Sequence, residues 1–148
     1  MKPIQLISPV DGSVYAERMP LSLDAAQQAA ARAKAAQKPW AARPLSERIA
    51  LVKAAVAALN AMTPQVVEEL AWQMGRPTRF GGEFGGVNAR TDYMSEIAAQ
   101  TLAPQMIEDS ASFRRYIARE ALGVVLIVAP WNYPYLTTIN TLVPALIA

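Results

Sequence analysis

The residues best suited to chemistry lie near the C-terminal end of the sequence, where residues 129–134 read Ala-Pro-Trp-Asn-Tyr-Pro. An apolar, β-branched run, Leu-Gly-Val-Val-Leu-Ile-Val-Ala, leads into this stretch. Pro130 and Pro134 fix their own φ angles and lack a backbone N–H, so the connection is stiff. Between them, Asn132 carries an uncharged amide with two hydrogen-bond donors. A rigidly held neutral donor can stabilise negative charge that develops on a substrate oxygen.

The same residues allow a second interpretation. Asn is a common N-cap, so Asn132 could cap a helix that follows it, with Trp131 packed in the core. From the local residue types alone, capping is the commoner role. Both interpretations place Asn132 at the junction between a strand and a helix.

Composition excludes several kinds of site. The sequence has 148 residues, of which 53% are apolar and 18% charged, as in an ordinary folded domain. The net charge is only +2 and the basic residues are scattered, so we expect no nucleic-acid partner. Cys and His are both absent. This absence removes the usual zinc sites, Cys–His and Ser–His–Asp nucleophiles, and disulfides, so we predict no metal site.

The two ends of the sequence bear on its location. The start, Met-Lys-Pro-Ile-Gln-Leu-Ile-Ser-Pro, lacks the apolar core of a signal peptide, so we expect a cytoplasmic protein. No charged residue follows Glu120, and a segment as long as 121–148 could cross a bilayer. Three prolines and several polar residues interrupt it, and no basic flank follows. We therefore predict burial inside a larger protein and no membrane partner.

The N-terminal part, residues 1–111, reads as a β-hairpin followed by a layer of four helices. The hairpin covers residues 4–15 and turns at Asp11-Gly12. The first helix has Ser22 or Asp24 as its N-cap and should stop at Pro39, and the second begins near Ser46. The third has Thr63 as N-cap, Pro64 at its first position and Gly75 as its stop, and the fourth runs from about Glu83 to Thr101. The apolar faces predicted for the last three helices are Ile49, Val52, Val56 and Leu59; Val67, Leu70, Ala71 and Met74; and Phe84, Val87, Thr91, Met94, Ala98 and Leu102.

The C-terminal part has a different character. Residues 112–120 carry charges on both faces and read as an exposed edge strand. Residues 121–148 read as a strand buried on both faces of a parallel sheet, then a helix with Pro134 in its first turn. Such a strand needs neighbours on both edges, and nothing upstream supplies them, so we expect them from the rest of a longer protein or from another chain. In open α/β sheets ligands bind at the carboxyl ends of strands, which is where Asn132 lies.

The longer string Arg-Glu-Ala-Leu-Gly-Val-Val, from Arg119 to Val125, followed by Pro-Trp-Asn-Tyr-Pro, resembles the aldehyde dehydrogenase superfamily. The upstream stretches "SPVDGSVYAER", "SERIALVKAAVAAL" and "MGRP" agree with this resemblance. It implies an α/β fold in which an N-terminal helical layer precedes the first buried strand of a parallel, Rossmann-type cofactor-binding sheet. The rest of the cofactor domain and the catalytic domain would lie outside these 148 residues.

The resemblance also implies roles for individual residues. Asn132 would donate its amide to the oxyanion formed when a cysteine thiolate attacks an aldehyde on its way to a carboxylic acid. The resemblance places Val128, Ala129, Pro130, Trp131 and Asn132 against NAD or NADP, and Tyr133, Leu136, Thr137 and Asn140 along the substrate tunnel. Residues 112–120 would form the arm of a homo-oligomer, a dimer or tetramer. The mixture of apolar and polar tunnel residues disfavours a purely aliphatic, fatty aldehyde.

Some of the family's functional groups are missing from the sequence. The Cys nucleophile, the Glu base and the Gly-rich cofactor loop of the family do not occur in it, so we expect the 148 residues alone to be inactive. Gly81–Gly86 is not a G-x-G-x-x-G sequence and reads as a loop. An alternative function is a truncated, non-catalytic relative that acts as a binding or oligomerisation module.

Overall fold

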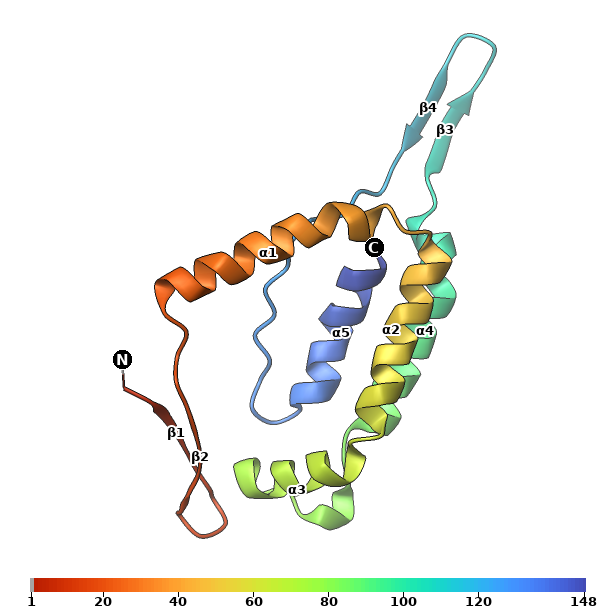
Figure 1. The fold of residues 1–148 in the computed structure, drawn as a ribbon. Coiled ribbons are helices and arrows are strands. Elements are labelled where there is room, and N and C mark those ends of the chain that lie inside the picture. Colours follow the sequence, from red (N-terminus) through yellow and green to blue (C-terminus); the bar gives the residue numbers. More distant parts are fainter. Residues whose placement is uncertain (1) are drawn as a thin grey trace.

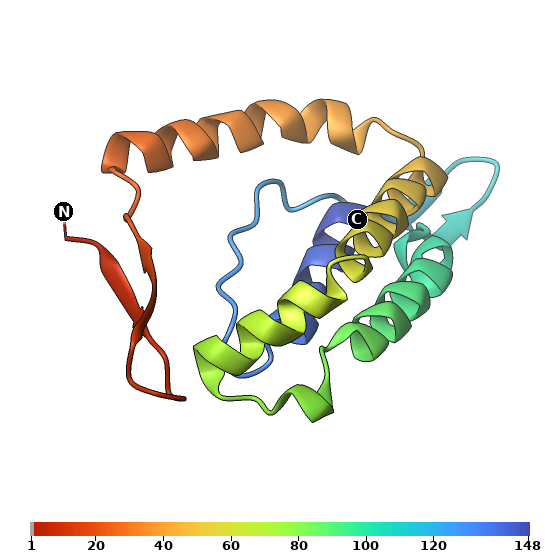
Figure 2. The same cartoon turned by 60° about the horizontal axis from the view of Figure 1, so that its bottom comes forward.

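The computed structural model describes residues 2–148. Its helices are α1 (Leu23–Ala41), α2 (Leu45–Asn60), α3 (Thr63–Met74), α4 (Phe84–Leu102) and α5 (Pro134–Ile147), with a short 3-10 helix η1 (Thr78–Phe80) before α4. Its strands are β1 (Ile4–Ile7), β2 (Val14–Arg18), β3 (Gln105–Asp109) and β4 (Arg114–Ile117). Helices α2, α4 and α5 lie side by side, α1 runs across one end of them, and the β3–β4 hairpin projects away (Figure 1). Figure 2 shows α1 standing apart from the other helices.

The core lies between α2, α3, α4 and α5. Val87 of α4 and Val143 of α5 are both fully buried, at 0% exposure. The remaining buried apolar residues are Val52, Val56, Val66, Leu70, Phe84, Ala98, Ile139 and Ile147. The faces predicted for α2 and α4 therefore point inward as expected. In α3 the buried residues are Val66 and Leu70. Val67, which was predicted to face inward, is only half-buried.

Helix α1 lies at the periphery of the helical layer, since none of its residues in the described structure is buried. Its firmest link to the core is Trp40, whose indole Nε1 donates to the Leu146 carbonyl at 2.8 Å. Ser22 caps α1 as predicted, accepting from Ala25 N at 3.1 Å. Pro39 does not stop the helix at once: it lies inside the last turn, and α1 ends two residues later, at Ala41.

The ends of α3 follow the sequence signals only in part. Gly75 terminates the helix in the left-handed conformation, with φ of 76°, as predicted for a glycine C-cap. Thr63 was predicted to be the N-cap, but it is the first helical residue, and Met62 precedes it in the N-cap position. The Thr63 hydroxyl instead donates to the Asn60 carbonyl at the end of α2, at 2.6 Å. It thereby ties the α2–α3 junction together.

Two separate antiparallel hairpins contain all the strands in residues 2–148. β1 and β2 pair around the predicted Asp11-Gly12 turn, where Gly12 has φ of 76°. β4 lies within the predicted edge strand 112–120, and its partner β3 was not predicted. β3 begins directly after α4, and its short polar sequence Gln-Met-Ile-Glu-Asp gives a weak strand signal.

The buried strand predicted for the apolar run at residues 122–129 is absent from the described structure. No strand forms there within the described residues, and Leu122, Leu126 and Val128 are 96%, 88% and 85% exposed. The less exposed residues alternate with these three, as in one face of a strand, and include Gly123 and Ile127. The segment stays irregular because no other strand of residues 2–148 lies beside it to accept and donate backbone hydrogen bonds.

Residues 121–148 thus comprise this irregular segment, a corner and α5, which has 14 residues. Pro134 occupies the first turn of α5 as predicted. Across residues 2–148, no helix taken singly combines the length and apolar character of a membrane span. Only α2 and α3 together, with a 66° bend between them, meet that criterion on length and composition.

Candidate functional site

The candidate site is centred on the corner formed by residues 130–133, which we call the Asn132 corner. It joins the irregular segment to α5, at the end of α5 that lies away from the C-terminus (Figure 1). Asn132 is exposed and Trp131 is 77% exposed. The interpretation in which Trp131 packs in the core is therefore wrong within the described structure.

The start of α5 shows that Asn132 is not its cap either. Tyr133 occupies the N-cap position, with φ of −137°, and no N-cap side chain within residues 2–148 bonds to the helix. The first backbone N–H groups of a helix need acceptors from elsewhere. One acceptor comes from a distant residue, since Leu136 N donates to the Glu83 carboxylate at 2.7 Å. The Asn132 amide is thus not used for capping.

Glu83 lies just before α4, and its side chain is only 1% exposed. Its second carboxylate oxygen accepts from Arg76 Nη1 at 3.0 Å, forming an ion pair in which the Arg76 side chain is 11% exposed. The carboxylate also faces the N-terminus of α5, where the helix dipole favours negative charge. A buried carboxylate with a cation, a backbone donor and a helix terminus as neighbours is fully compensated.

Arg76 reaches the Asn132 corner directly. Its Nη2 donates to the Asn132 carbonyl at 2.5 Å, and its guanidinium carbon lies 4.6 Å from the centroid of the Tyr133 ring. The planar guanidinium can serve Glu83 and the corner together because its donors point in several fixed directions. Arg76 therefore links α4, the corner and the first turn of α5.

The residues expected along the substrate tunnel divide into two groups. Tyr133, Thr137 and Asn140 are exposed on one side of α5, opposite the buried stripe that contains Ile139 and Val143. Leu136 lies at the border between these sides and is half-buried.

Leu136 also packs closely against α4. A Cβ placed on Gly86 would lie 3.0 Å from Leu136 Cδ1, so the absence of a side chain at Gly86 makes room for this leucine. A cavity of about 270 Å³ lies here, lined by Arg76, Glu83 and Tyr133 together with Phe80, Gly82, Gly85, Gly86 and Leu136.

Next to Leu136, Tyr135 points toward the core side of α5. Its ring centroid lies 5.6 Å from that of Phe84. Burial raises the pKa of the Tyr135 phenol above its usual value, and the carboxylates of Glu69 and Glu83 add to this effect. Tyr135 therefore stays neutral at physiological pH.

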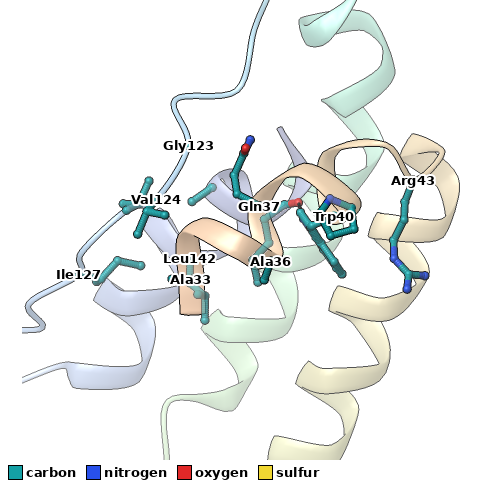
Figure 3. A pocket seen from close by; sticks show the side chains of 13 residues that line it. Ala33, Ala36, Gln37, Trp40, Arg43, Gly123, Val124, Ile127 and Leu142 are labelled. Carbon is teal, nitrogen blue, oxygen red and sulfur yellow. Dashed lines mark hydrogen bonds between the residues drawn. The ribbon is translucent and has the colours of Figure 1, made fainter. Parts of the chain in front are cut away.

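The residues expected against the cofactor form an exposed, uncharged strip. Val128 is 85% exposed, Ala129 and Trp131 are exposed, and Pro130 is half-buried. The described residues do not enclose this strip in a pocket. A separate apolar groove of about 480 Å³ lies between α1, α5 and the neighbouring part of the segment (Figure 3). Its lining includes Ala33, Trp40, Gly123, Ile127 and Leu142.

Arg76 and Glu83 are the site residues that the sequence interpretation missed. One signal for Glu83 was available: with Val87 and Thr91 it has the i, i+4, i+8 spacing of a buried helical stripe. A charge on such a stripe needs a partner. Arg76, immediately after the glycine stop of α3, is a cation close to it in sequence.

Comparison with known proteins identifies the family to which this helical layer, projecting hairpin and proline-framed Asn132 corner belong. The family model described as "Aldehyde dehydrogenase family" matches residues 1–148, and the chain belongs to this family. The fold class expected from the sequence, α/β and aldehyde dehydrogenase-like, is confirmed by its structural neighbours.

Individual relatives agree. The chain is 31% identical to a vanillin dehydrogenase of Corynebacterium glutamicum, over 95% of this chain and 29% of that protein. It superposes on PnpE in complex with nicotinamide adenine dinucleotide with a TM-score of 0.87 and 27% identity, covering 99% of this chain and 30% of PnpE. A NADP-dependent glyceraldehyde-3-phosphate dehydrogenase from Bacillus halodurans, complexed with NADP, superposes with a TM-score of 0.83 and 26% identity. The match covers 99% of this chain and 32% of that enzyme. The chain thus spans about a third or less of the length of these proteins.

Proposed function

We propose that the protein containing this chain oxidises an aldehyde to a carboxylic acid, with NAD or NADP as hydride acceptor, and that Asn132 donates to the oxyanion. Family membership supports the reaction class. The observation that carries the role of Asn132 is the corner itself. Its amide is exposed between two prolines, and Glu83 rather than Asn132 caps α5.

To stabilise the oxyanion, Asn132 needs only to hold its amide N–H in the right position. When a thiolate adds to an aldehyde carbonyl, the carbonyl oxygen becomes an alkoxide and gains a full negative charge. A preorganised amide N–H aimed at that oxygen stabilises the charged state more than the neutral carbonyl. Asn132 suits this role because its amide is uncharged and cannot be lost by titration near neutral pH. The 148 residues contain no Cys, so the thiolate belongs to another part of the protein.

The exposed strip beside Asn132 fits one side of a nicotinamide cofactor. Val128, Ala129, Pro130 and Trp131 offer apolar, uncharged surface next to the amide. When bound, the cofactor supplies the hydride acceptor for the oxidation. The structural relatives PnpE and the Bacillus halodurans enzyme are complexes with NAD and NADP respectively, which supports either cofactor.

The substrate class follows from the exposed side of α5. Tyr133 and Leu136 offer apolar surface, whereas Thr137 and Asn140 add polar groups along the same helix. We infer an aldehyde with both apolar and polar character. The relationship to a vanillin dehydrogenase supports including vanillin in the first set of substrates to be tested.

We also propose that the protein is a cytoplasmic homo-oligomer, with β4 in the assembly arm. The β3–β4 hairpin projects from the helices (Figure 1). It exposes Tyr116 and Ile117, at 53% and 48%. Apolar side chains on an edge strand favour pairing with another chain. Size-exclusion chromatography with light scattering tests the assembly: a monomer would contradict it.

A second candidate, a non-catalytic binding or oligomerisation module, is favoured if the natural protein as a whole lacks Cys, as these 148 residues do. Two observables distinguish the candidates. The enzyme requires a reactive cysteine in the purified natural protein, detectable by thiol labelling, together with aldehyde-dependent reduction of NAD or NADP. A natural protein with neither property is the module.

Steady-state kinetics of an Asn132→Ala variant of the complete protein test the proposed role. We expect kcat to fall about 10²–10³-fold, equivalent to about 3–4 kcal/mol, the usual loss for one oxyanion donor. Gln28→Ala is the matched control because it removes an exposed amide from α1. With thiolate addition and hydride transfer shown to limit kcat, equal kcat values for the two variants would contradict the assignment.

A further inference from the structure

We propose that the buried Arg76–Glu83 pair positions Asn132, acting as a clamp that fixes the orientation of the corner before substrate binds. The inference rests on the proposed role of Asn132. Arg76 and Glu83 are positioning residues in this proposal, since they act through Asn132 and not on the reacting atoms.

The prolines alone do not fix the Asn132 side chain. Pro130 and Pro134 set their own φ angles, and each restricts the residue before it. Trp131 and Asn132 keep both of their backbone torsions free of this restraint. Trp131 is 77% exposed, so packing does not hold it either. The direction of the Asn132 side chain must therefore be fixed by contacts with other residues.

Arg76 supplies that restraint at the corner. A hydrogen bond from its Nη2 to the Asn132 carbonyl, at 2.5 Å, fixes the plane of the peptide that follows Asn132. The guanidinium lies over the next side chain, 4.6 Å from the Tyr133 ring centroid. Two contacts on consecutive residues limit rotation of the corner as a unit.

Glu83 supplies the restraint at the helix. It accepts from Leu136 N at 2.7 Å and so replaces the missing N-cap side chain of α5. It also accepts from Arg76 Nη1 at 3.0 Å, which orients the guanidinium that holds Asn132. The corner is therefore tied to the start of α4 through one carboxylate and one guanidinium.

The burial of this pair argues for a role beyond stability. Desolvating two charges is costly, and a buried ion pair is often no more stabilising than apolar residues of the same size. The exposed Lys53–Asp92 pair, at 2.8 Å, has no such cost. The Arg76–Glu83 pair connects to the corner through backbone and ring contacts that an apolar pair could not make.

A double-mutant cycle on the complete protein tests the clamp. Arg76→Lys keeps the charge but loses the planar fork, so one ammonium cannot hold both Glu83 and the Asn132 carbonyl. We expect it to lower kcat by about 10–10²-fold with KM little changed, as for a misplaced catalytic group. In the Asn132→Ala background the same substitution should change kcat less than about twofold, because the group it positions is gone.

The outcomes separate the two proposals. If Asn132→Ala leaves kcat unchanged, the oxyanion role fails. If Asn132→Ala lowers kcat but the Arg76→Lys effect is fully additive to it, the clamp is refuted while the oxyanion role stands. Asp92→Asn, which breaks the exposed Lys53–Asp92 pair, is the matched control and should leave kcat unchanged.

Hydrogen exchange gives a second readout that does not depend on activity. Glu83→Ala removes the acceptor of the Leu136 N–H and loosens the first turn of α5, so exchange at Leu136 and Thr137 should quicken at least tenfold, while residues 139–147 stay protected. Glu83→Gln keeps a carbonyl oxygen at this position and should restore most of the protection. Unchanged exchange at Leu136 and Thr137 in Glu83→Ala would overturn the clamp even if the variant lost activity.

Discussion

Gly86→Ala tests whether the contact between α4 and Leu136 is as tight as the structure shows. Gly86 lies in the first turn of α4, and a Cβ added there would meet Leu136 Cδ1 at 3.0 Å and Cδ2 at 3.5 Å. Its neighbour Gly85 is in the same turn, but a Cβ there would meet nothing within 4 Å. The two adjacent glycines therefore form a matched pair in which only Gly86 has this contact.

Two opposing effects set the magnitude. Replacing a helical glycine by alanine stabilises a protein by up to about 1 kcal/mol, because the unfolded chain loses freedom and helix propensity rises. Gly85→Ala should gain this full stabilisation, because its added methyl group meets no other atom. At Gly86 the added methyl must displace Leu136, and overpacking of this kind costs about 1–3 kcal/mol. We expect Gly86→Ala to be neutral or destabilising by up to about 2 kcal/mol.

Urea unfolding of both variants, followed by far-UV circular dichroism, measures this difference. Gly86→Ala should also raise KM for the aldehyde, because Leu136 belongs to the proposed substrate surface and would shift. Gly85→Ala should leave KM unaltered. If Gly86→Ala stabilised the protein as much as Gly85→Ala, the close packing of Leu136 on α4 would be refuted.

Two further predictions concern other parts of the structure. Tyr135 has a raised pKa in the folded state, so stability present below about pH 10 is lost as the pH rises toward the folded value. Between about pH 9 and about pH 11, the free energy of unfolding should fall more steeply for the wild type than for Tyr135→Phe, and parallel curves would contradict the burial of this phenol. Ser8 is 1% exposed, donates to the Trp72 carbonyl at 2.7 Å and accepts from Val10 N at 3.2 Å. Ser8→Ala should therefore cost about 1–3 kcal/mol in urea unfolding, and a cost below about 0.5 kcal/mol would show that water replaces both bonds.

Local sequence signals predicted the helices well where each signal acts within one element. Gly75 stops α3 because a left-handed residue is needed there, and Pro134 starts α5 because a missing N–H costs nothing at that position. The inward stripe of α4, from Phe84 to Ala98, follows from helical spacing alone.

Features that depend on distant partners were harder to predict. Residues 121–130 have the composition of a buried strand, yet they are largely exposed because burial needs neighbouring strands that residues 2–148 do not provide. β3 was missed because its pairing with β4, and not its own composition, makes it a strand. The links from Arg76 and Glu83 to Asn132 and Leu136 join residues more than fifty positions apart, which no local pattern encodes.

At the site, the sequence identified the Asn132 corner but not what holds it. The position between two prolines pointed to Asn132, and the local rule for caps offered a competing role. The structure decides against capping, because Tyr133 is the N-cap and Glu83 serves the helix.

The rate of hydride transfer in the first turnover tests the central claim most directly. Rapid mixing of the complete Asn132→Ala protein with saturating NAD or NADP and aldehyde isolates thiolate addition and hydride transfer from product release. If the Asn132 amide stabilises the oxyanion, this rate falls about 10²–10³-fold while cofactor affinity stays close to the wild-type value. A first-turnover rate equal to that of the wild type would contradict the claim.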